Sequence, residues 1–471
     1  MQSTDSTYAI AIVVLALVWL GIAGVRSMRA SRGRGLGQYF LGGHTVTWMG
    51  LAASLFVTSL WALWCVGVEL SFQSNALAWS ILGLGVAAGL LLLATVFSPV
   101  FRQRGVLTVA EYLSGSYRHA GTSATVASAF ILLTLLIRIP ITIVLGGKLL
   151  HAIFGWDPVT AALLMIVVPG IFAVAGGYAA AFAIQGVAAV VAVAGLVFLG
   201  SAGTPETILP FVVHFTGPVP HWTFLAGGLA VFAFWQSCVD QSIVQRVAAA
   251  ASSRDPRRAA FAAAGAIALG GLAIGIGAAT RTTNMLPSGD WAGLARGFVG
   301  ASLLACAMAA LAGHFLSVST MCTMDIFRQL RSASDESVLV LIGRLMTTMA
   351  VVFSILVSSV LALVGDAAII WLVVAYVVFG VPLAAVALVG FGWARQHAVS
   401  AFAGLLVGWS LGCVQAVVRA DHMMSHEGLL WVIVTAFGGA AATMAGLNVC
   451  ATSGISWMHV MPRRDIRVPK S

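Results

Sequence analysis

Three ionisable side chains stand inside long apolar stretches of the 471-residue sequence: Arg138, Asp240 and His314. Arg138 lies about ten residues, or roughly 15 Å by helical rise, from the end of its stretch, near the middle of a membrane-spanning helix. A charge there costs about 2.5 to 3.5 kcal/mol on insertion scales, so it is expected to face a cavity or a partner. Its guanidinium could bind a carboxylate or phosphate through paired hydrogen bonds. The alternative is a structural ion pair, with Asp240 as the candidate partner.

Asp240 lies toward one end of its apolar stretch, beside Gln241. Its carboxyl group could carry a proton, or it could bond Gln241, Gln245 or Arg246 in a polar helix end. His314 lies among small residues and is a further candidate proton group, because its unperturbed pKa of about 6.5 lies near neutral pH. Asp240, Gln241 and His314 are therefore the candidates for ion or proton coupling.

The elements that position these groups are membrane helices. The chain is 60% hydrophobic and 8% charged, with a mean hydropathy of +1.01, whereas soluble domains carry roughly 25% charged residues. No segment between apolar runs is long enough for a soluble domain, so we expect one all-α membrane domain over residues 1–471. A crossing needs about 20 apolar residues. By that measure we predict thirteen spans at 8–25, 45–69, 76–99, 121–150, 158–178, 181–201, 222–248, 258–280, 298–325, 338–364, 367–392, 398–418 and 428–450.

The distribution of basic residues predicts the orientation, since Lys and Arg accumulate in cytoplasmic loops. With an external N-terminus, eighteen of the 24 Lys and Arg residues fall inside, among them Arg246, and four fall outside; Arg138 and Arg344 remain within spans. We therefore expect an external N-terminus and an internal C-terminus in a bacterial-type inner membrane. The net charge of +9 then faces acidic lipid head groups, and no nucleic-acid partner is needed.

Several function classes find no support in the sequence. The six cysteines stand singly, without CxxC or Cys/His spacing, so no metal or cofactor is expected. We find no P-loop and no HExxH pattern, and the scattered His, Asp and Glu residues do not suggest an enzyme. The first span is followed by basic residues without a small-residue cleavage site, which predicts a retained helix. Arg344 is close enough to a helix end to reach the interface and is given a structural role.

Several short segments resemble the sodium/solute symporter family. Tyr39 to Gly43 is similar to a YFLAGR-like stretch of that family, and Thr108 to Leu113 resembles its T-x-x-E-Y-L pattern. The most specific segment is Asp240 to Ala249, close to the family's D/N-Q-x-x-x-Q-R-x-x-A-A. Thr320 to Ile326 resembles the family's S/T-x-x-T-x-D-I/V ending. Together with Gly176-Gly177 and Phe391-Gly392-Trp393, these matches extend over about residues 38 to 410.

The resemblance implies the inverted-repeat transporter fold, with two five-helix repeats and a solute site near the midplane. The repeats would cover about residues 45–201 and 222–392, leaving 8–25, 398–418 and 428–450 as peripheral helices. Helix breaks are expected near residues 57–60 and 235–238. The resemblance places solute contacts at Ser54, Trp61, Trp64, Trp235 and Ser237, besides Arg138. A bulky indole at Trp64 argues against a sugar, since sugar-transporting relatives tend to carry polar residues there.

The sequence departs from the family where sodium is expected. Sodium-coupled members hold the ion with backbone carbonyls of the first core helix and hydroxyls of the helix that corresponds to 298–325. Ala309 and Ala310 stand where a pair of hydroxyl residues is expected, and Gln185 replaces an aspartate. Alanine offers no side-chain oxygen, and a dehydrated hard cation needs oxygen ligands. The coupling ion, Na⁺ or H⁺, therefore stays open.

The resemblance implies a secondary active transporter of a small organic solute, with an anion among the candidates. Proton-coupled transport, exchange and uncoupled transport on the same fold are the alternatives, followed by a transporter-like membrane sensor. The expected partners are the solute and membrane lipids, and the oligomeric state is not indicated by the sequence.

Overall fold

The computed structural model describes residues 2–30, 35–69, 76–116, 121–202, 222–280, 290–331, 334–364, 366–392, 398–422 and 426–452. Their regular structure is helical, apart from one isolated backbone bridge between Val46 and Ala250. The prediction of an all-α membrane protein is confirmed. The predicted division at Gly365 lies outside the described residues.

The first half of the chain forms eight α-helices. They are α1 (Gln2–Ala30), α2 (Leu36–Leu41), α3 (Trp48–Glu69), α4 (Ala76–Leu92), α5 (Ser98–Arg104), α6 (Val109–Ser116), α7 (Gly121–Phe154) and α8 (Pro158–Ala202). A 3₁₀ turn, η1 (Gly42–His44), follows α2, and a π-helical stretch, η3 (Leu93–Phe97), joins α4 to α5. The short helices α2 and α6 were not predicted from the sequence.

The second half continues with nine α-helices. They are α9 (Trp222–Phe234), α10 (Gln241–Ala248), α11 (Asp255–Thr280), α12 (Asp290–Thr320), α13 (Arg328–Leu330), α14 (Glu336–Val364), α15 (Asp366–Gly392), α16 (Ala398–Val418) and α17 (His426–Thr452). Two π-helical stretches interrupt this half, η4 (Trp235–Val239) and η6 (Met321–Phe327). A 3₁₀ turn, η7 (Ala420–His422), lies between α16 and α17.

Eleven described helical stretches are long and apolar enough to cross a membrane. One of them, the 41 residues Pro158–Phe198 of α8, would be about 60 Å long if straight, twice the thickness of the hydrocarbon core. The backbone breaks at Gly177, which divides α8 into two crossings. The interrupted segment α9–η4–α10 forms a further crossing, although α9 and α10 are each too short to span the membrane alone. The thirteen predicted spans are compatible with this arrangement.

Gly177 is the residue that allows α8 to turn. Its φ of +60° and ψ of −150° lie where residues with a Cβ atom are disfavoured. A Cβ atom added there would come within 2.5 Å of the carbonyl oxygen of Tyr39. The backbone of α2 therefore packs directly against the turn. This turn is the hairpin predicted around Gly176, Gly177 and Tyr178.

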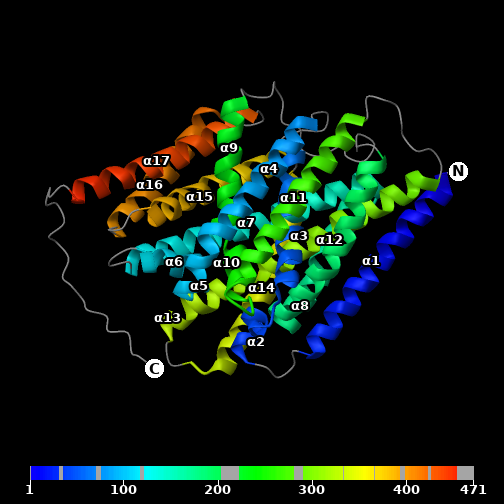
Figure 1. The fold of residues 1–471 in the computed structure, drawn as a ribbon, viewed down its shortest axis with the longest axis horizontal. Coiled ribbons are helices and arrows are strands. Elements are labelled where there is room, and N and C mark those ends of the chain that lie inside the picture. Colours follow the sequence, from blue (N-terminus) through cyan, green and yellow to red (C-terminus); the bar gives the residue numbers. More distant parts are fainter. Residues whose placement is uncertain are drawn as a thin grey trace.

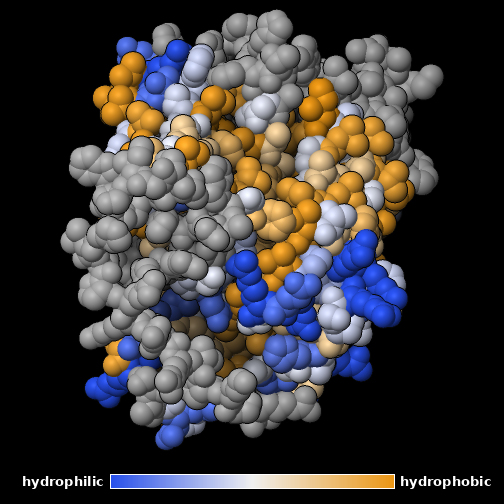
Figure 2. Space-filling model, turned by 60° about the vertical axis from the view of Figure 1, so that its left-hand side comes forward, coloured by the Kyte–Doolittle hydropathy of each residue, from blue (hydrophilic) through white to orange (hydrophobic). Residues whose placement is uncertain are grey.

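The helices differ strongly in burial. The apolar core of α12 is buried along its most hydrophobic window, whereas α1 and α14 have only 28% of theirs buried. Figure 1 shows α1 along one flank, beside α8 and α12, and the pair α16 and α17 along the opposite flank. In Figure 2, apolar side chains form a broad band over the visible face, with hydrophilic side chains gathered below it. This pattern is what a bilayer-embedded helix bundle requires.

The two expected helix breaks have different outcomes. The break at 235–238 is confirmed, because the π-helical stretch η4 is followed by Asp240, whose ψ of 128° is extended. The break at 57–60 is wrong, because α3 is a continuous helix from Trp48 to Glu69. This part of α3 contains no Gly or Pro, and the Thr58 hydroxyl donates to the Ser54 carbonyl at 2.9 Å, within the helix.

Candidate functional site

Arg138 and Asp240 form a buried ion pair between α7 and the break in front of α10. Arg138 Nη1 donates to Asp240 Oδ2, and the two side chains are 8% and 6% exposed. The second carboxylate oxygen accepts from the Ser242 backbone N–H at 2.8 Å and from the Ser242 hydroxyl. Asp240 thus caps α10 at its N-terminus and neutralises the cation. The structural pairing proposed from the sequence is present.

A glutamine and a tyrosine complete the surroundings of the guanidinium. With its amide oriented to satisfy both neighbours, Gln236 accepts from Arg138 Nη1 at 2.9 Å, and its nitrogen donates to the Tyr376 hydroxyl at 3.2 Å. The Arg138 guanidinium carbon lies 6.0 Å from the centre of the Tyr376 ring, within the range of a cation–π contact. Arg138 is therefore fixed from α7, η4 and α15 together.

Arg138 lies in the wall of a pocket among α3, α7, α9, η4, α15 and α17. Its empty space, including the open solvent at its mouth, is about 770 Å³. The lining is mostly apolar. It consists of Trp61, Ala62, Cys65, Arg138, Ile141, Thr142, Gly228, Leu229, Phe232, Gln236, Val373, Tyr376, Val377, Leu429, Leu430 and Ile433.

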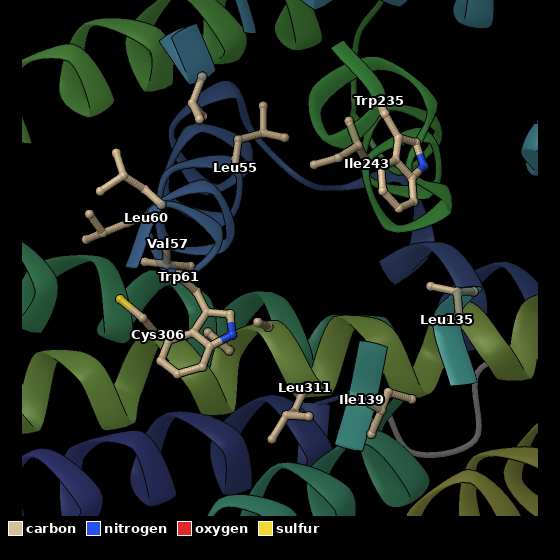
Figure 3. Packing of buried hydrophobic residues seen from close by; sticks show 14 of the residues in the cluster. Leu55, Val57, Leu60, Trp61, Leu135, Ile139, Trp235, Ile243, Cys306 and Leu311 are labelled. Carbon is tan, nitrogen blue, oxygen red and sulfur yellow. The ribbon is translucent and has the colours of Figure 1, made fainter. Parts of the chain in front are cut away.

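The predicted solute contacts do not all lie in this pocket. Arg138 and Trp61 line it, and the Trp61 indole donates to the Thr142 hydroxyl at 3.4 Å. Trp64 is buried but is not among the lining residues. Trp235 packs on Tyr376, with ring centres 4.5 Å apart, and stands behind the wall. Figure 3 shows Trp61 on α3 and Trp235 on the broken helix in one cluster of buried apolar residues.

Ser237 and Ser54 lie away from the pocket. Ser237 faces Gly89 of α4, where a Cβ atom would come within 2.7 Å of its hydroxyl oxygen. Ser54 lies on α3 one turn before Thr58, and its hydroxyl donates to Gln185 Oε1 at 2.6 Å. Ser54 thus belongs to a second polar cluster, which also contains the positions where sodium is expected.

The second cluster is built around Arg246. Its Nε donates to the Ser54 hydroxyl at 2.7 Å, Nη2 to the Thr58 hydroxyl at 2.9 Å, and Nη1 to the Ser242 carbonyl at 2.7 Å. Gln185 continues the chain, since its Nε2 donates to the Ala309 carbonyl at 3.0 Å. The structure therefore brings α3, α8, α10 and α12 together in one hydrogen-bonded network.

Arg246 is fully buried, which corrects the sequence analysis. It was counted among the cytoplasmic loop residues because it follows a polar run near a helix end. Gly313 on α12 makes room for it, since a Cβ atom there would lie 2.6 Å from Arg246 Nη2. Without Arg246, the predicted inside set falls from eighteen basic residues to seventeen.

The other polar residues of α10 join neighbouring segments of the bundle. Gln241 accepts from the Val109 N–H at 2.8 Å and donates to the Leu107 carbonyl at 3.2 Å, so it holds the start of α6. Gln245 donates to the Phe40 carbonyl at 2.9 Å and accepts from the Ser317 hydroxyl at 3.2 Å. Gln241, a coupling candidate, is thus engaged with backbone groups.

His314 lies one residue from Gly313 on α12 and is fully buried. Neither ring nitrogen has a hydrogen-bond partner among the described residues. Ala310, one turn earlier, is also buried and adds no oxygen. The described residues contain no group of three His, Cys, Asp or Glu side chains that could hold a metal ion.

A polar pocket of about 840 Å³ lies near α6, η6 and α13, at the other end of α7 from Lys148. The Thr108 hydroxyl donates to Asp325 Oδ1 at 3.0 Å, which joins the start of α6 to η6. Thr108 also caps α6, because it accepts from the Glu111 N–H at 3.1 Å, while the Glu111 carboxylate accepts from the Leu107 N–H at 2.8 Å. The arrangement is a variant of the capping box, with the return bond to the residue before the cap, and it explains the spacing of Thr108 and Glu111.

Nearby, α2 is fixed by a buried phenol. Burial raises the pKa of Tyr39 to about 12, so its hydroxyl stays protonated and shares a hydrogen bond of 2.9 Å with Thr347 on α14. Tyr39 and Phe40 are both buried, with their rings edge to face. The YFLGG segment therefore serves as a packing element at the turn of α8.

Sequence reasoning missed several residues of the two clusters. Gln236 and Tyr376 were not candidates, although Gln236 stands between the candidates Trp235 and Ser237. Thr142 and Thr58 each stand one helical turn from a residue that was selected, Arg138 and Ser54. Both lie four residues after a candidate residue, on the same face of its helix, where a neighbour of that candidate is expected.

The model of the Sodium:solute symporter family matches residues 39–203 and 284–408, more than half of the chain. The Asp240 to Ala249 segment lies between the two matched ranges. Among curated proteins, the chain is 26% identical over 483 residues to sodium/glucose cotransporter 4 of zebrafish (Danio rerio), covering 87% of this chain and 72% of that protein. It is 27% identical over 465 residues to a sodium/mannose cotransporter of cattle (Bos taurus), covering 84% and 76%.

Among solved structures, the chain resembles a substrate-bound, outward-open Na⁺-coupled sialic acid symporter. The TM-score is 0.75 at 19% identity, over 95% of this chain and 97% of the other. At that identity the likeness shows the fold, and it agrees with the inverted-repeat architecture expected from the sequence. The fold, the relatives and the matched family model lead to one conclusion. This chain belongs to the sodium:solute symporter family and is a secondary active transporter of small solutes.

Proposed function

We propose that the protein carries a small organic anion with a largely apolar body, bound in the pocket beside Arg138. The observation that carries the proposal is the Arg138 guanidinium in an otherwise mostly apolar wall. The pocket's polar side chains already have partners: Thr142 accepts from Trp61, and Gln236 bonds Tyr376. A polyol would leave several hydroxyls unpaired there, which costs free energy.

The charge balance of the core favours a negative solute. Three charged side chains are buried in the described part of the chain, Arg138, Asp240 and Arg246. Two are cations and one is an anion, so the core carries one positive charge in excess. Buried charges require neutralisation, and a carboxylate on the solute would supply it. Arg138 can share its remaining N–H donors between Asp240 and the solute, because a guanidinium has five.

A neutral solute is the second candidate. The Arg138–Asp240 pair already cancels its own charge, so a neutral molecule could bind the same apolar walls without meeting an unpaired ion. The two candidates differ in one measurable property, the preference for a carboxylate over the amide of identical shape.

The experiment is competition for uptake in proteoliposomes, with pairs of small monocarboxylates and their primary amides. For an anion carrier, each acid competes at least 10-fold better than its amide, since a hydrogen bond to a charged group contributes roughly 1.5 to 3 kcal/mol and 1.4 kcal/mol is a factor of about ten. Arg138→Ala is expected to abolish uptake. Equal competition by acid and amide would favour the neutral solute, and unchanged uptake by Arg138→Ala would refute a role for Arg138.

We further propose that the N-terminus faces outward, so that the pocket opens to the outside of a bacterial-type inner membrane. The seventeen-to-four distribution of basic residues supports this orientation. Lining residues at the start of α9 and α17 and in the second half of α3 lie toward the side of the N-terminus when successive spans alternate. The coupling candidates are Na⁺ and H⁺, and Asp240 and His314 remain the candidate proton groups.

A further inference from the structure

The cluster around Arg246 can be tested as a sodium site, because the family is named for sodium coupling. Sodium is a hard cation that needs several oxygen ligands in place of its water shell. Three positions differ from the family in sequence: Gln185, Ala309 and Ala310. Gln185 of α8 is hydrogen-bonded both to Ser54 of α3 and to the Ala309 carbonyl of α12, and Ala310 follows Ala309 on that helix. The structure therefore brings together the segments expected to form a sodium site.

The oxygens in this cluster are already bonded to donors. Ser54 Oγ accepts from Arg246 Nε, Thr58 Oγ1 accepts from Arg246 Nη2, and the Ala309 carbonyl accepts from Gln185 Nε2. Gln185 Oε1 accepts from the Ser54 hydroxyl. Ala309 and Ala310 carry no side-chain oxygen. The donor set therefore does not fit a sodium ion.

The charge of the cluster points the same way. Arg246 is fully buried, and it donates hydrogen bonds to three neutral oxygens, those of Ser54, Thr58 and Ser242. The buried carboxylate of Asp240 is taken by Arg138 and Ser242. A carboxylate at position 185 would cancel the charge of Arg246 and leave room for one added cation. Because Gln185 is neutral, the charge of Arg246 is not cancelled, and Arg246 supplies the positive charge that a bound cation would otherwise add.

We propose that Arg246 is the permanent cation of this cluster and that the cluster binds no sodium. The inference rests on the proposed transport function only for its biological meaning, namely that the fixed charge of Arg246 replaces the binding of a coupling ion at this cluster. The binding of ions to the cluster itself can be measured without any solute. The sodium-binding result can therefore be interpreted even if the transported solute is not identified.

The test is ²²Na⁺ binding to the purified full-length protein in detergent, compared with Ser54→Ala. The matched control is Ser354→Ala, a buried hydroxyl on α14 that bonds only its own helix, to the Ala350 carbonyl at 2.6 Å. We expect wild type, Ser54→Ala and Ser354→Ala to bind sodium equally, within twofold, at every concentration. A saturable sodium component in wild type that Ser54→Ala removes and Ser354→Ala retains would overturn the proposal.

A gain-of-binding variant tests the charge argument. Gln185→Asp/Ala309→Ser/Ala310→Ser supplies a carboxylate and two hydroxyls, and we expect it to bind about one ²²Na⁺ per protein above the wild-type level. Ala309→Ser/Ala310→Ser alone keeps the excess positive charge and is expected to bind none. Equal binding by the triple and the double variant would contradict the role of the fixed charge.

Discussion

At the scale of single residues, the Arg138–Asp240 pair combines a structural and a functional task. It fixes α7 against the break before α10, and it also lies in the pocket wall. Removing one partner of a buried pair leaves an uncompensated charge and destabilises by about 3 to 5 kcal/mol, whereas removing both is often neutral. Stability and transport should therefore respond differently to single and double substitution.

Asp240→Asn is the informative single variant, because the amide oxygen can still cap α10 by accepting from the Ser242 N–H. We expect a clear drop in apparent melting temperature in detergent, measured by size-exclusion chromatography after heating. Arg138→Met/Asp240→Asn should recover most of that loss while uptake stays absent. If Asp240→Asn were as stable as wild type, another anion would have to neutralise Arg138.

At the scale of elements, the turn within α8 depends on one glycine. Gly177→Ala places a Cβ atom at a positive φ and against the Tyr39 carbonyl, and a residue with a Cβ atom held at this φ and ψ costs roughly 1 to 3 kcal/mol. We expect a lower yield of folded protein and a lower melting temperature. Gly186→Ala, in the same helix with open space around its Cβ position, is the control and should be neutral or slightly stabilising. A normal melting temperature for Gly177→Ala would show that the hairpin can shift to accept it.

The elements also show what could be predicted from the sequence. Hydropathy located the crossings to within a few residues, because a span is set by a run of apolar side chains. The broken helix at Trp235 to Asp240 was expected from resemblance alone, and the continuity of α3 through residues 57–60 was not foreseen. Backbone breaks without Gly or Pro depend on tertiary partners, here the ion pair of Asp240 with Arg138 on α7, which no local pattern contains.

The candidate site was only half predictable for the same reason. Arg138 stood out because a charge in an apolar run is costly, and Asp240 was one candidate for its partner. Arg246 was assigned to the membrane surface, because polarity near a helix end resembles a loop. Its burial follows from four helices converging on it and from the space that Gly313 leaves. Such convergence is a property of the packed bundle.

At the scale of the whole molecule, the pocket and the orientation make a joint prediction. Cys65 is half-buried in the pocket wall, and Cys322 is half-buried on η6, toward the opposite end of the bundle. With an external N-terminus, Cys65 should be labelled from outside by a membrane-impermeant thiol reagent, in a variant that retains it as the single cysteine. A bound solute should slow that labelling, since it fills the same space.

A variant that retains only Cys322 is the matched control. With the proposed orientation it should resist the reagent in intact cells and react in inverted membrane vesicles, because the seventeen basic residues predict a cytoplasmic location for that end. The reverse pattern, Cys322 labelled in cells and Cys65 only in inverted vesicles, would invert the topology. Cys65 could also be labelled from outside without any protection by competing carboxylates. That result would support the orientation but would contradict the assignment of the pocket as the solute site.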